Sequence, residues 1–274
     1  MRAMATQLEK GRAFRALHER AGAFIIPNPW DAGTARLLAQ AGFEALATTS
    51  AGSAFSLGKA DGQVGLLATM EQCATIAAAT ELPVSGDLEN GFGDGPETVA
   101  ETIRLAAAAG LVGGSIEDAS GERTIYEMRL ATERIAAAAE AARALGFPFT
   151  LTARAENYLY GREDLEDTIR RLRAYEEAGA DVLYAPGLKR GEDIVAVVRA
   201  VERPVNVLMG LEGAAFRLED LSEMGVKRVS IGSALSRTAM GAVLEAAREM
   251  RERGTFTFAS KAARYRDLNE MFGQ

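Results

Sequence analysis

The feature that most constrains this chain is an alternation of short apolar runs with longer helical patterns. Eight runs have the length of buried strands, and several are rich in Val, Ile, Leu or Thr. The runs are Phe24–Pro27, Ala45–Thr49, Val84–Leu88, Gly114–Glu117, Phe149–Ala153, Val182–Ala185, Val205–Leu208 and Arg228–Ile231. Eight strands separated by helices predict an α/β fold, a (β/α)8 TIM-type barrel.

Amphipathic or Ala-rich segments fill the intervals between these runs. The clearest predicted helices are Thr34–Ala41, Pro96–Ala109, Glu127–Leu145, Glu163–Ala178 and Phe216–Met224. Each is followed by a glycine, the usual residue after a helix because it adopts left-handed backbone angles. These predicted caps are Gly42, Gly110, Gly146, Gly179 and Gly225. Extra helices are expected at the N-terminus, Thr6–Arg20, and in the C-terminal tail, Thr257–Phe272.

An open doubly wound sheet is the alternative architecture. Such sheets often carry a Gly-rich phosphate-binding turn after the first strand. Here the first run leads into Pro27-Asn28-Pro29-Trp30-Asp31, and no GxGxxG follows. The barrel is therefore favoured. Since 274 residues suit one barrel and no linker stands out, residues 1–274 are expected to form a single domain.

Charge and composition exclude several functions. The net charge is −7 and no basic stripe is present, which argues against nucleic acid as a partner. No uninterrupted apolar stretch of about 18 residues occurs, so no membrane span is expected. The single cysteine, Cys73, precludes an internal disulfide, and the charged N-terminus does not resemble a signal peptide. A cytoplasmic location is therefore expected.

Acidic side chains end two strands that should be neighbours. In a barrel of this kind the active site lies at the carboxyl ends of the strands. Asp87 and Glu89 end the third predicted strand and Glu117 ends the fourth, with Asp118 next to it. One of Glu117 and Asp118 should face inward. Converging carboxylates repel unless a cation lies between them, and oxygen ligands suit Mg²⁺. The alternative reading of Asp87 and Glu89 is a solvated acidic turn.

The other strand ends add groups that bind anions. Arg154 and Glu156 share one face of the fifth strand, and a guanidinium suits a substrate carboxylate or a salt bridge to the acids. The only histidine, His18, lies in the N-terminal helix, so no histidine base or metal ligand is expected. Lys189 follows the sixth strand in a loop, which argues against a Schiff-base aldolase.

Five segments, taken together, resemble the isocitrate lyase / phosphoenolpyruvate mutase superfamily. They are Asn28–Asp31, Thr49–Gly52, Gly86–Gly93, Ile116–Asp118 and Ala153–Glu156. The resemblance covers most of the chain, through the eighth strand. It implies a barrel in which Mg²⁺, with Mn²⁺ as a possible substitute, stabilises an enolate-like oxyanion of a pyruvate-type intermediate. It also implies a homo-oligomer, a dimer or a tetramer, with the C-terminal helix exchanged between subunits.

The resemblance assigns roles residue by residue. It implies that Asp87 binds the metal directly, with Glu89 and Glu117 in its inner or outer shell. Asp61 matches an aspartate near the metal's waters. The implied substrate-binding residues are Ser50, Ala51 and Gly52 through their backbone, Arg154 through its side chain, and Asn206 on the seventh strand.

One departure from the family narrows the expected chemistry. Family lyases carry a Lys-Lys-Cys-Gly-His segment on the loop after strand four, whereas residues 120–127 here contain neither Cys nor His. Cleavage of isocitrate or methylisocitrate by that route is therefore not expected. The loop 119–129 is still expected to close over the site by analogy.

What remains is a lyase or decarboxylase acting on a small 2-oxo or 2-hydroxy carboxylic acid. Decarboxylation needs no base, whereas retro-aldol cleavage requires one, and the sequence leaves Glu156, Tyr158, Tyr184 and a metal-bound water open for that role. The alternatives are phosphonopyruvate-type C–P mutase or hydrolase chemistry, and a barrel that binds a keto acid without turnover.

Overall fold

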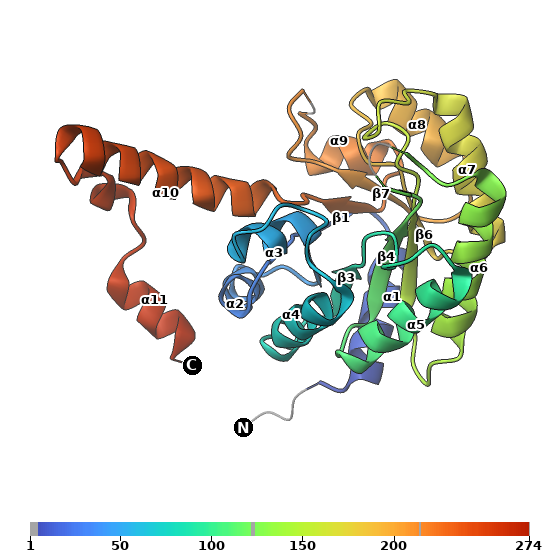
Figure 1. Cartoon of the computed structure of the whole chain (residues 1–274), viewed down its shortest axis with the longest axis horizontal. Helices are drawn as coiled ribbons and strands as arrows, with labels where there is room; N and C mark the ends of the chain where they lie inside the picture. The colour runs from blue at the N-terminus through green and yellow to red at the C-terminus, as the bar shows by residue number, and fades with distance from the viewer. Residues whose placement is uncertain (1–4, 122–123, 214, 274) are drawn as a thin grey trace.

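The computed structural model describes residues 5–121, 124–213 and 215–273, and its centre is a barrel of eight parallel strands (Figure 1). The strands are β1 Phe24–Ile26, β2 Leu46–Ala47, β3 Val84–Asp87, β4 Gly113–Glu117, β5 Thr150–Arg154, β6 Val182–Tyr184, β7 Val205–Leu208 and β8 Arg228–Ser230. They run in the order β1-β8-β7-β6-β5-β4-β3-β2. The backbone N–H of Ala47 donates to the carbonyl of Pro27 at 3.1 Å, which links the two ends of this series. The predicted (β/α)8 barrel is confirmed.

Helices alternate with the strands as predicted. They are α1 Gln7–Glu19, α2 Ala32–Gln40, α3 Ser50–Ser56, α4 Leu66–Ala78, α5 Pro96–Ala108, α6 Met128–Arg143, α7 Leu165–Glu177, α8 Gly191–Ala200, α9 Leu218–Glu223, α10 Ala234–Arg253 and α11 Tyr265–Phe272. Four of the five predicted glycine caps have positive φ: Gly42, Gly110, Gly179 and Gly225. The prediction for Gly146 is wrong, because α6 ends three residues earlier and the chain leaves the helix through Ala144 and Leu145.

The main hydrophobic core lies between the outer face of the sheet and the helices. Outward-facing strand residues such as Ile116 and Leu151 pack with Ile103 of α5 and Leu172 of α7. A smaller cluster closes the amino-terminal ends of the strands, where Phe14 of α1 is fully buried. A Cβ at Gly113 would lie 2.8 Å from the Phe14 ring, so glycine lets α1 approach the barrel this closely. This arrangement leaves the carboxyl ends of the strands for the site.

The inside of the barrel is unusually polar. TIM-barrel interiors are normally filled by bulky branched side chains. Here the strands turn small or polar side chains inward around a cavity, and the larger apolar ones outward. The polar residues at the cavity include Ser85, Ser115, Tyr184, Asn206, Arg228 and Ser230. Small side chains leave room for the cavity to reach down between the strands.

The C-terminal part of the chain forms an arm. Helix α10 extends away from the barrel, and α11 lies at the end of the arm (Figure 1). The amide of Gln40 on α2 donates to the carbonyl of Met271 at 2.6 Å, so α11 contacts α2 of the same chain. The single helix predicted for Thr257–Phe272 is wrong: the structure has a 3-10 turn, Thr257–Lys261, and then α11.

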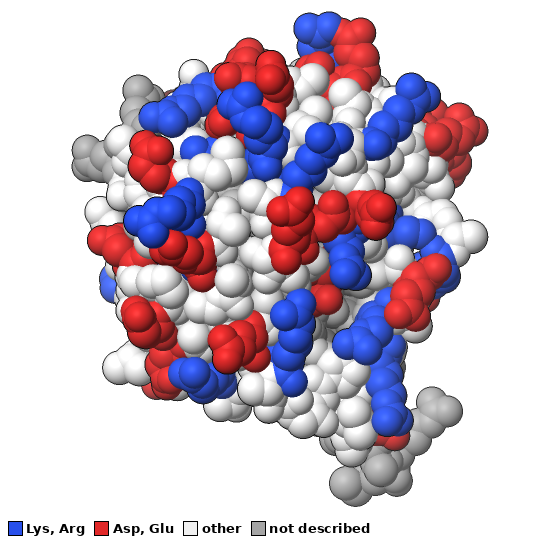
Figure 2. Space-filling model, turned by 90° about the vertical axis from the view of Figure 1, so that its right-hand side faces the viewer, with Lys and Arg blue, Asp and Glu red and all other residues white. Residues whose placement is uncertain are grey.

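The outer helices carry mixed charge. On the face shown in Figure 2, acidic and basic side chains interleave rather than forming a basic stripe. Exposed pairs such as Arg129–Glu133 and Arg104–Glu101 occur along single helices. Among the described residues no helix is both long enough and apolar enough to cross a membrane.

Candidate active site

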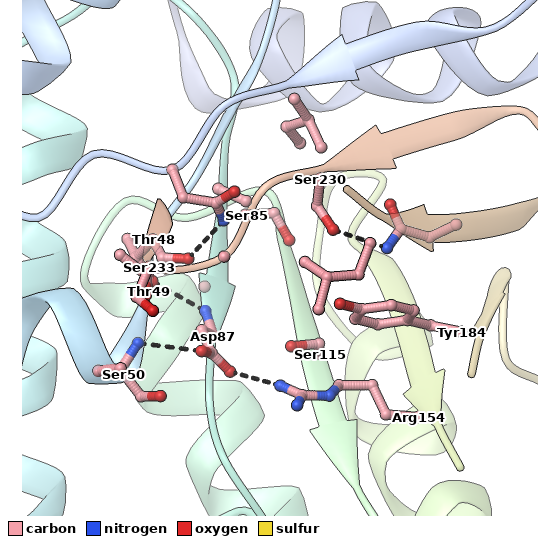
Figure 3. Close-up of a pocket in the computed structure, with 18 of the residues that line it drawn as sticks. Thr48, Thr49, Ser50, Ser85, Asp87, Ser115, Arg154, Tyr184, Ser230 and Ser233 are labelled. Carbon is pink, nitrogen blue, oxygen red and sulfur yellow. Dashed lines mark hydrogen bonds and ion pairs between the residues drawn. The ribbon is translucent and has the colours of Figure 1, made fainter. Parts of the chain in front are cut away.

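A cavity of about 150 Å³ opens at the carboxyl ends of the strands (Figure 3). Its walls come from β1 to β8 and from the turns that follow β2 and β8. The polar residues lining it are Asn28, Thr48, Thr49, Ser50, Asp61, Ser85, Asp87, Ser115, Arg154, Tyr184, Asn206, Arg228, Ser230 and Ser233. A cavity at this end of a barrel is where TIM-barrel enzymes hold their substrates.

Asp87, the last residue of β3, is held from three directions. One carboxylate oxygen accepts the backbone N–H of Ser50 at 2.9 Å, and the other accepts Nη1 of Arg154 at 2.9 Å. Its own N–H donates to the hydroxyl of Thr48 at 2.8 Å. These contacts fix the carboxylate at the cavity wall, as Figure 3 shows. Each oxygen keeps a lone pair for a further ligand.

Arg154, the last residue of β5, joins three carboxylates. It lies 2.9 Å from Asp87, 2.9 Å from Glu117 and 2.8 Å from Glu156. Burial alone would lower the pKa of its guanidinium, but Glu117, Glu156 and Asp87 outweigh burial and raise it well above its usual value. Three of its five N–H donors serve these acids, which leaves two for another anion.

The carboxylates outnumber the cations around them. Burial, followed by the charges of Asp87 and Asp61, raises the pKa of Glu89 to about 7. Burial and then Asp87 raise the pKa of Asp61. Burial also raises the pKa of Glu117 well above its usual value, although Arg154 opposes that shift. One guanidinium does not neutralise this group, so the site favours an added cation.

Glu89 adopts a strained conformation. The sequence analysis placed Glu89 at the end of the third strand, but β3 ends at Asp87. Strand alternation therefore does not set the direction of the Glu89 side chain. Its φ is 49° and that of Phe92 is 59°, a region that side-chain-bearing residues seldom occupy. The buried Arg134 of α6 secures this turn by donating to the carbonyls of Asn90, Gly93 and Asp94. Strain of this kind is concentrated at functional sites.

The donor set suits Mg²⁺, although no cage is ready-made. Among residues 5–121, 124–213 and 215–273, no three acidic, histidine or cysteine side chains converge as a metal site. Mg²⁺ commonly retains several waters and binds protein through one or two carboxylates. Asp87 would provide the direct ligand, with Glu89 and Glu117 reached directly or through water. The surplus of negative charge and the all-oxygen donors fit such an ion.

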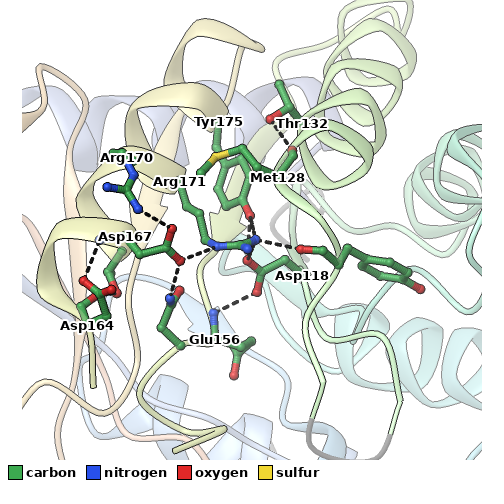
Figure 4. A network of polar contacts seen from close by, with 12 residues as sticks. Asp118, Met128, Thr132, Glu156, Asp164, Asp167, Arg170, Arg171 and Tyr175 are labelled. Atoms are coloured by element: carbon green, nitrogen blue, oxygen red, sulfur yellow. Dashed lines mark hydrogen bonds and ion pairs between the residues drawn. The ribbon is translucent and has the colours of Figure 1, made fainter. Parts of the chain in front are cut away.

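Asp118 belongs to a second network of polar contacts, with Arg171, Tyr175 and the backbone of Glu156 (Figure 4). One oxygen accepts the backbone N–H of Glu156 at 2.8 Å, and the other accepts the hydroxyl of Tyr175 at 2.6 Å and Nη1 of Arg171 at 3.1 Å. Arg171 also donates to the carbonyl of Tyr126. Of the two acids at the end of β4, Glu117 therefore faces Arg154, and Asp118 positions the backbone beside it.

Of the two tyrosines proposed from sequence, Tyr184 lines the cavity, whereas Tyr158 lies among other charges. Burial, then Asp193 and Glu163, raises the pKa of Tyr158, and its Cβ lies close to Gly187. Burial, then Glu117 and Glu156, raises the pKa of Tyr160 to about 12. Tyr160 therefore interacts with these acids, and Tyr158 does not, although the sequence analysis did not name Tyr160. Its position beyond the strand, in the Tyr158–Gly161 turn, offered no periodic signal.

The other predicted residues are placed as follows. Ser50, Ala51, Asp61 and Asn206 line the cavity, together with Asp87 and Arg154. Gly52 is not among the residues that line the cavity. Its N–H donates to the Thr49 hydroxyl at 3.2 Å as part of the α3 cap. Glu89 lines a smaller adjoining cavity with Cys73. Glu117 and Glu156 form ion pairs with Arg154, which lines the main cavity. Burial raises the pKa of Cys73 to about 12, so its thiol stays protonated at neutral pH.

One further residue of the site was missed by sequence reasoning. Arg228, at the start of β8, lines the cavity, although arginine in an apolar strand pattern reads as an outward-facing residue. The loop after β4 begins with paired backbone at Ala119 and Ile125, and residues 122–123 lie outside the described part. Closure of loop 119–129 stays a prediction.

Comparisons with known proteins find relatives of this chain. A solved structure from Burkholderia cenocepacia J2315, provisionally assigned as a lyase/mutase, is 64% identical, with a TM-score of 0.96 and coverage of 98% of this chain and 97% of that one. An uncharacterised protein of Mycobacterium tuberculosis H37Rv is 32% identical over 86% of this chain and 88% of its own length. The oxaloacetate decarboxylase of Paraburkholderia xenovorans LB400 is 30% identical over 81% of this chain and 75% of its own.

A family-wide sequence model gives the assignment. The model of phosphoenolpyruvate phosphomutase matches residues 14–251, which include every strand of the barrel. The resemblance inferred from the five segments is confirmed. The chain belongs to the phosphoenolpyruvate phosphomutase family, within the isocitrate lyase / phosphoenolpyruvate mutase superfamily.

Proposed function

We propose that the protein is a Mg²⁺-dependent carbon–carbon lyase or decarboxylase for a small 2-oxo or 2-hydroxy carboxylic acid. The observation that carries the proposal is the grouping of Asp87, Glu117 and Glu156 around Arg154 at the mouth of the cavity. Family membership and the decarboxylase relative support the same reaction class.

The chain's own residues would bind and orient the substrate. Asp87, with Glu89 and Glu117 around it, would hold the cation. Arg154 retains two N–H donors that can clamp a carboxylate, and its three acidic partners fix the direction of the guanidinium. The chemistry that a bound Mg²⁺ supplies is withdrawal of charge from the substrate's carboxylate and 2-oxygen as the bond breaks.

The base for a retro-aldol reaction would come from a residue near these acids. Glu156 is buried, and one of its carboxylate oxygens already accepts the Nε–H of Arg154 at 2.8 Å, which hinders it from accepting a substrate proton. Burial raises the pKa of Tyr184 to about 12, so almost none of it is deprotonated and able to act as a base at neutral pH. A decarboxylation needs no base to start, so it makes the smaller demand on this site.

The test is a substrate screen with and without Mg²⁺. Purified protein is incubated with 2-oxo and 2-hydroxy di- and tricarboxylates, and with phosphonopyruvate, and assayed for pyruvate, glyoxylate, CO₂ and phosphate. We expect Mg²⁺-dependent release of a keto acid or CO₂, abolished in Asp87→Ala and retained in the exposed control Glu101→Ala. Phosphate release from phosphonopyruvate would instead assign C–P chemistry, and full metal-dependent activity in Asp87→Ala would refute the metal site.

The arm supports association between copies of the chain. Val243 and Leu244 on α10 are 68% and 64% exposed, and Phe256 and Tyr265 are exposed farther along. Large apolar side chains gathered on one projecting segment are typical of protein–protein contacts. We infer that the protein is a homo-oligomer in which this arm packs against another copy. We also propose that the protein is cytoplasmic.

A further inference from the structure

Arg228 is a buried cation in the wall of the cavity, and one of its donors has no partner in the described part of the chain. It is the first residue of β8 and only 5% exposed. Its Nε donates to the side-chain oxygen of Asn206 at 2.9 Å, and Nη2 donates to the hydroxyl of Thr152 at 3.0 Å. Nη1 is buried and has no hydrogen-bond partner among the described residues. Buried donors are seldom left in this condition.

No protein carboxylate balances this charge. Within the described ranges, no acidic side chain forms an ion pair with Arg228, whereas Arg154 in the same cavity pairs with three. Burial lowers the pKa of Arg228 to about 10, so the side chain is still a cation at neutral pH. A buried charge without a partner is costly, and the missing partner here is an anion.

The position of Arg228 relates it to the rest of the site. Paired residues run around the barrel from Arg154 to Tyr184, Asn206 and then Arg228. Both arginines line one cavity, and the intervening wall carries hydroxyl and amide groups, as Figure 3 shows for Tyr184 and Ser230. A ligand whose first carboxylate is held near Asp87 and Arg154 therefore meets a second, uncompensated guanidinium in the same space.

We propose that Arg228 binds the distal carboxylate of a dicarboxylic substrate and thereby selects dicarboxylates over monocarboxylates. The proposal rests on the proposed function for the other end of the substrate. A carboxylate bound against the guanidinium from the cavity neutralises its charge. A substrate with a methyl group at that end leaves the charge uncompensated, which discriminates strongly in a buried site.

The test uses two ligands that differ only at the distal end. Malate carries a carboxylate where 2-hydroxybutyrate carries a methyl group, and neither decarboxylates in solution as a 2-oxo acid can. Affinities are measured by calorimetry, with Mg²⁺, for the wild type, Arg228→Met, Arg228→Lys and the exposed control Arg173→Met. Circular dichroism and thermal unfolding verify that each variant is folded. Acetate is titrated separately as a free carboxylate.

We expect the wild type and Arg173→Met to bind malate at least tenfold more tightly than 2-hydroxybutyrate. Arg228→Met should bring the two affinities within about threefold by weakening malate alone, and Arg228→Lys should restore part of the preference. Equal wild-type affinities, no binding of either ligand, or equal weakening of both by Arg228→Met would overturn the proposal. So would acetate binding that depends on Arg228 as strongly as malate binding does, because it would indicate a free-anion site.

Failure of this inference is distinct from failure of the proposed function. The ligand preference is a binding measurement and requires no turnover. A protein that prefers malate through Arg228 yet turns over no acid with Mg²⁺ would retain the inference and lose the lyase. A protein that cleaves monocarboxylates and dicarboxylates equally well would retain the lyase and lose the inference.

Discussion

The hydroxyl of Tyr175 lies 2.6 Å from a carboxylate oxygen of Asp118. The other oxygen of Asp118 holds the N–H of Glu156, so a helix on the outside of the barrel is connected to an acid at the site through one buried side chain. Asp118 also pairs with Arg171, which leaves a buried cation partly unsatisfied if the acid is neutralised.

Asp118→Asn should therefore destabilise the protein by about 3 kcal/mol, since it removes one partner of a buried ion pair. Tyr175→Phe removes a single hydrogen bond from the same carboxylate and should cost about 1 kcal/mol. Urea unfolding monitored by fluorescence measures both. Equal losses in the two variants would show that the charge of Asp118 contributes nothing beyond its hydrogen bonds.

Tyr158 and Tyr160 should differ in their effect on catalysis. If Tyr160 moves or orients a proton beside Glu117 and Glu156, Tyr160→Phe should lower kcat at least about 100-fold, the usual scale for an acid–base group. Tyr158 lies near Asp193 and Glu163 rather than near Glu117 and Glu156. Tyr158→Phe should therefore change kcat by less than about twofold. Steady-state kinetics on the substrate found in the screen decides. A larger loss in Tyr158→Phe would restore the assignment made from sequence.

His18 should make stability depend on pH below neutrality. Burial, followed by the charge of Arg228, lowers its pKa to about 3, whereas an unfolded histidine titrates near 6.5. The unfolded chain therefore takes up a proton first, and the stability that neutral His18 provides is lost as pH falls from about 6.5 towards 3. The loss due to this residue should be roughly 2 kcal/mol at pH 5.

His18 is the only histidine, so a single variant isolates this contribution. The difference in unfolding free energy between the wild type and His18→Gln should shrink by that amount between pH 7 and pH 5. Denaturant titrations at the two pH values measure it, and comparing variants cancels the titration of the site's carboxyls. A difference that stays constant with pH would mean that His18 is protonated in the folded protein.

Charges placed on the arm should disrupt association between copies. Val243→Asp together with Leu244→Asp puts two carboxylates at exposed apolar positions of α10, the helix that extends away from the barrel (Figure 1). We expect the mass measured by light scattering after size exclusion to fall to that of a smaller assembly. Exposed Arg251→Asp on the same helix is the control. An unchanged mass in the double variant would place the contact elsewhere.

The sequence predicted the barrel because the apolar strand runs are a local property that recurs eight times, and four of the five predicted glycine caps marked helix ends correctly. Strand ends also located Asp87, Glu117 and Arg154, since register follows directly from the strand positions. The direction of Glu89 was beyond that reasoning, because a strained φ held by Arg134 from another helix is a tertiary effect. The break in the predicted C-terminal helix, at the 3-10 turn before α11, was likewise not predicted. The single-domain organisation stays a prediction, which one cooperative unfolding transition would check.

Arg228 shows the limit of pattern reading. Its neighbours Val229 and Val226 are buried in the core, and nothing in the spacing tells that the arginine beside them faces the inside of the barrel without a counter-charge. Such information arises only when strands that are distant in sequence, here β5, β7 and β8, close around one space.

The polar lining of the barrel has an evolutionary consequence. Because the apolar core lies between sheet and helices, positions such as Ser85, Ser115 and Ser230 contribute little to holding the fold together. Substitutions there can reshape the chamber without dismantling its walls. Because the residues that line the cavity are not those that form the apolar core, single substitutions can change which substrate is bound. Randomised libraries at these three serines should yield folded proteins far more often than libraries at Ile116, Leu151 or Leu172.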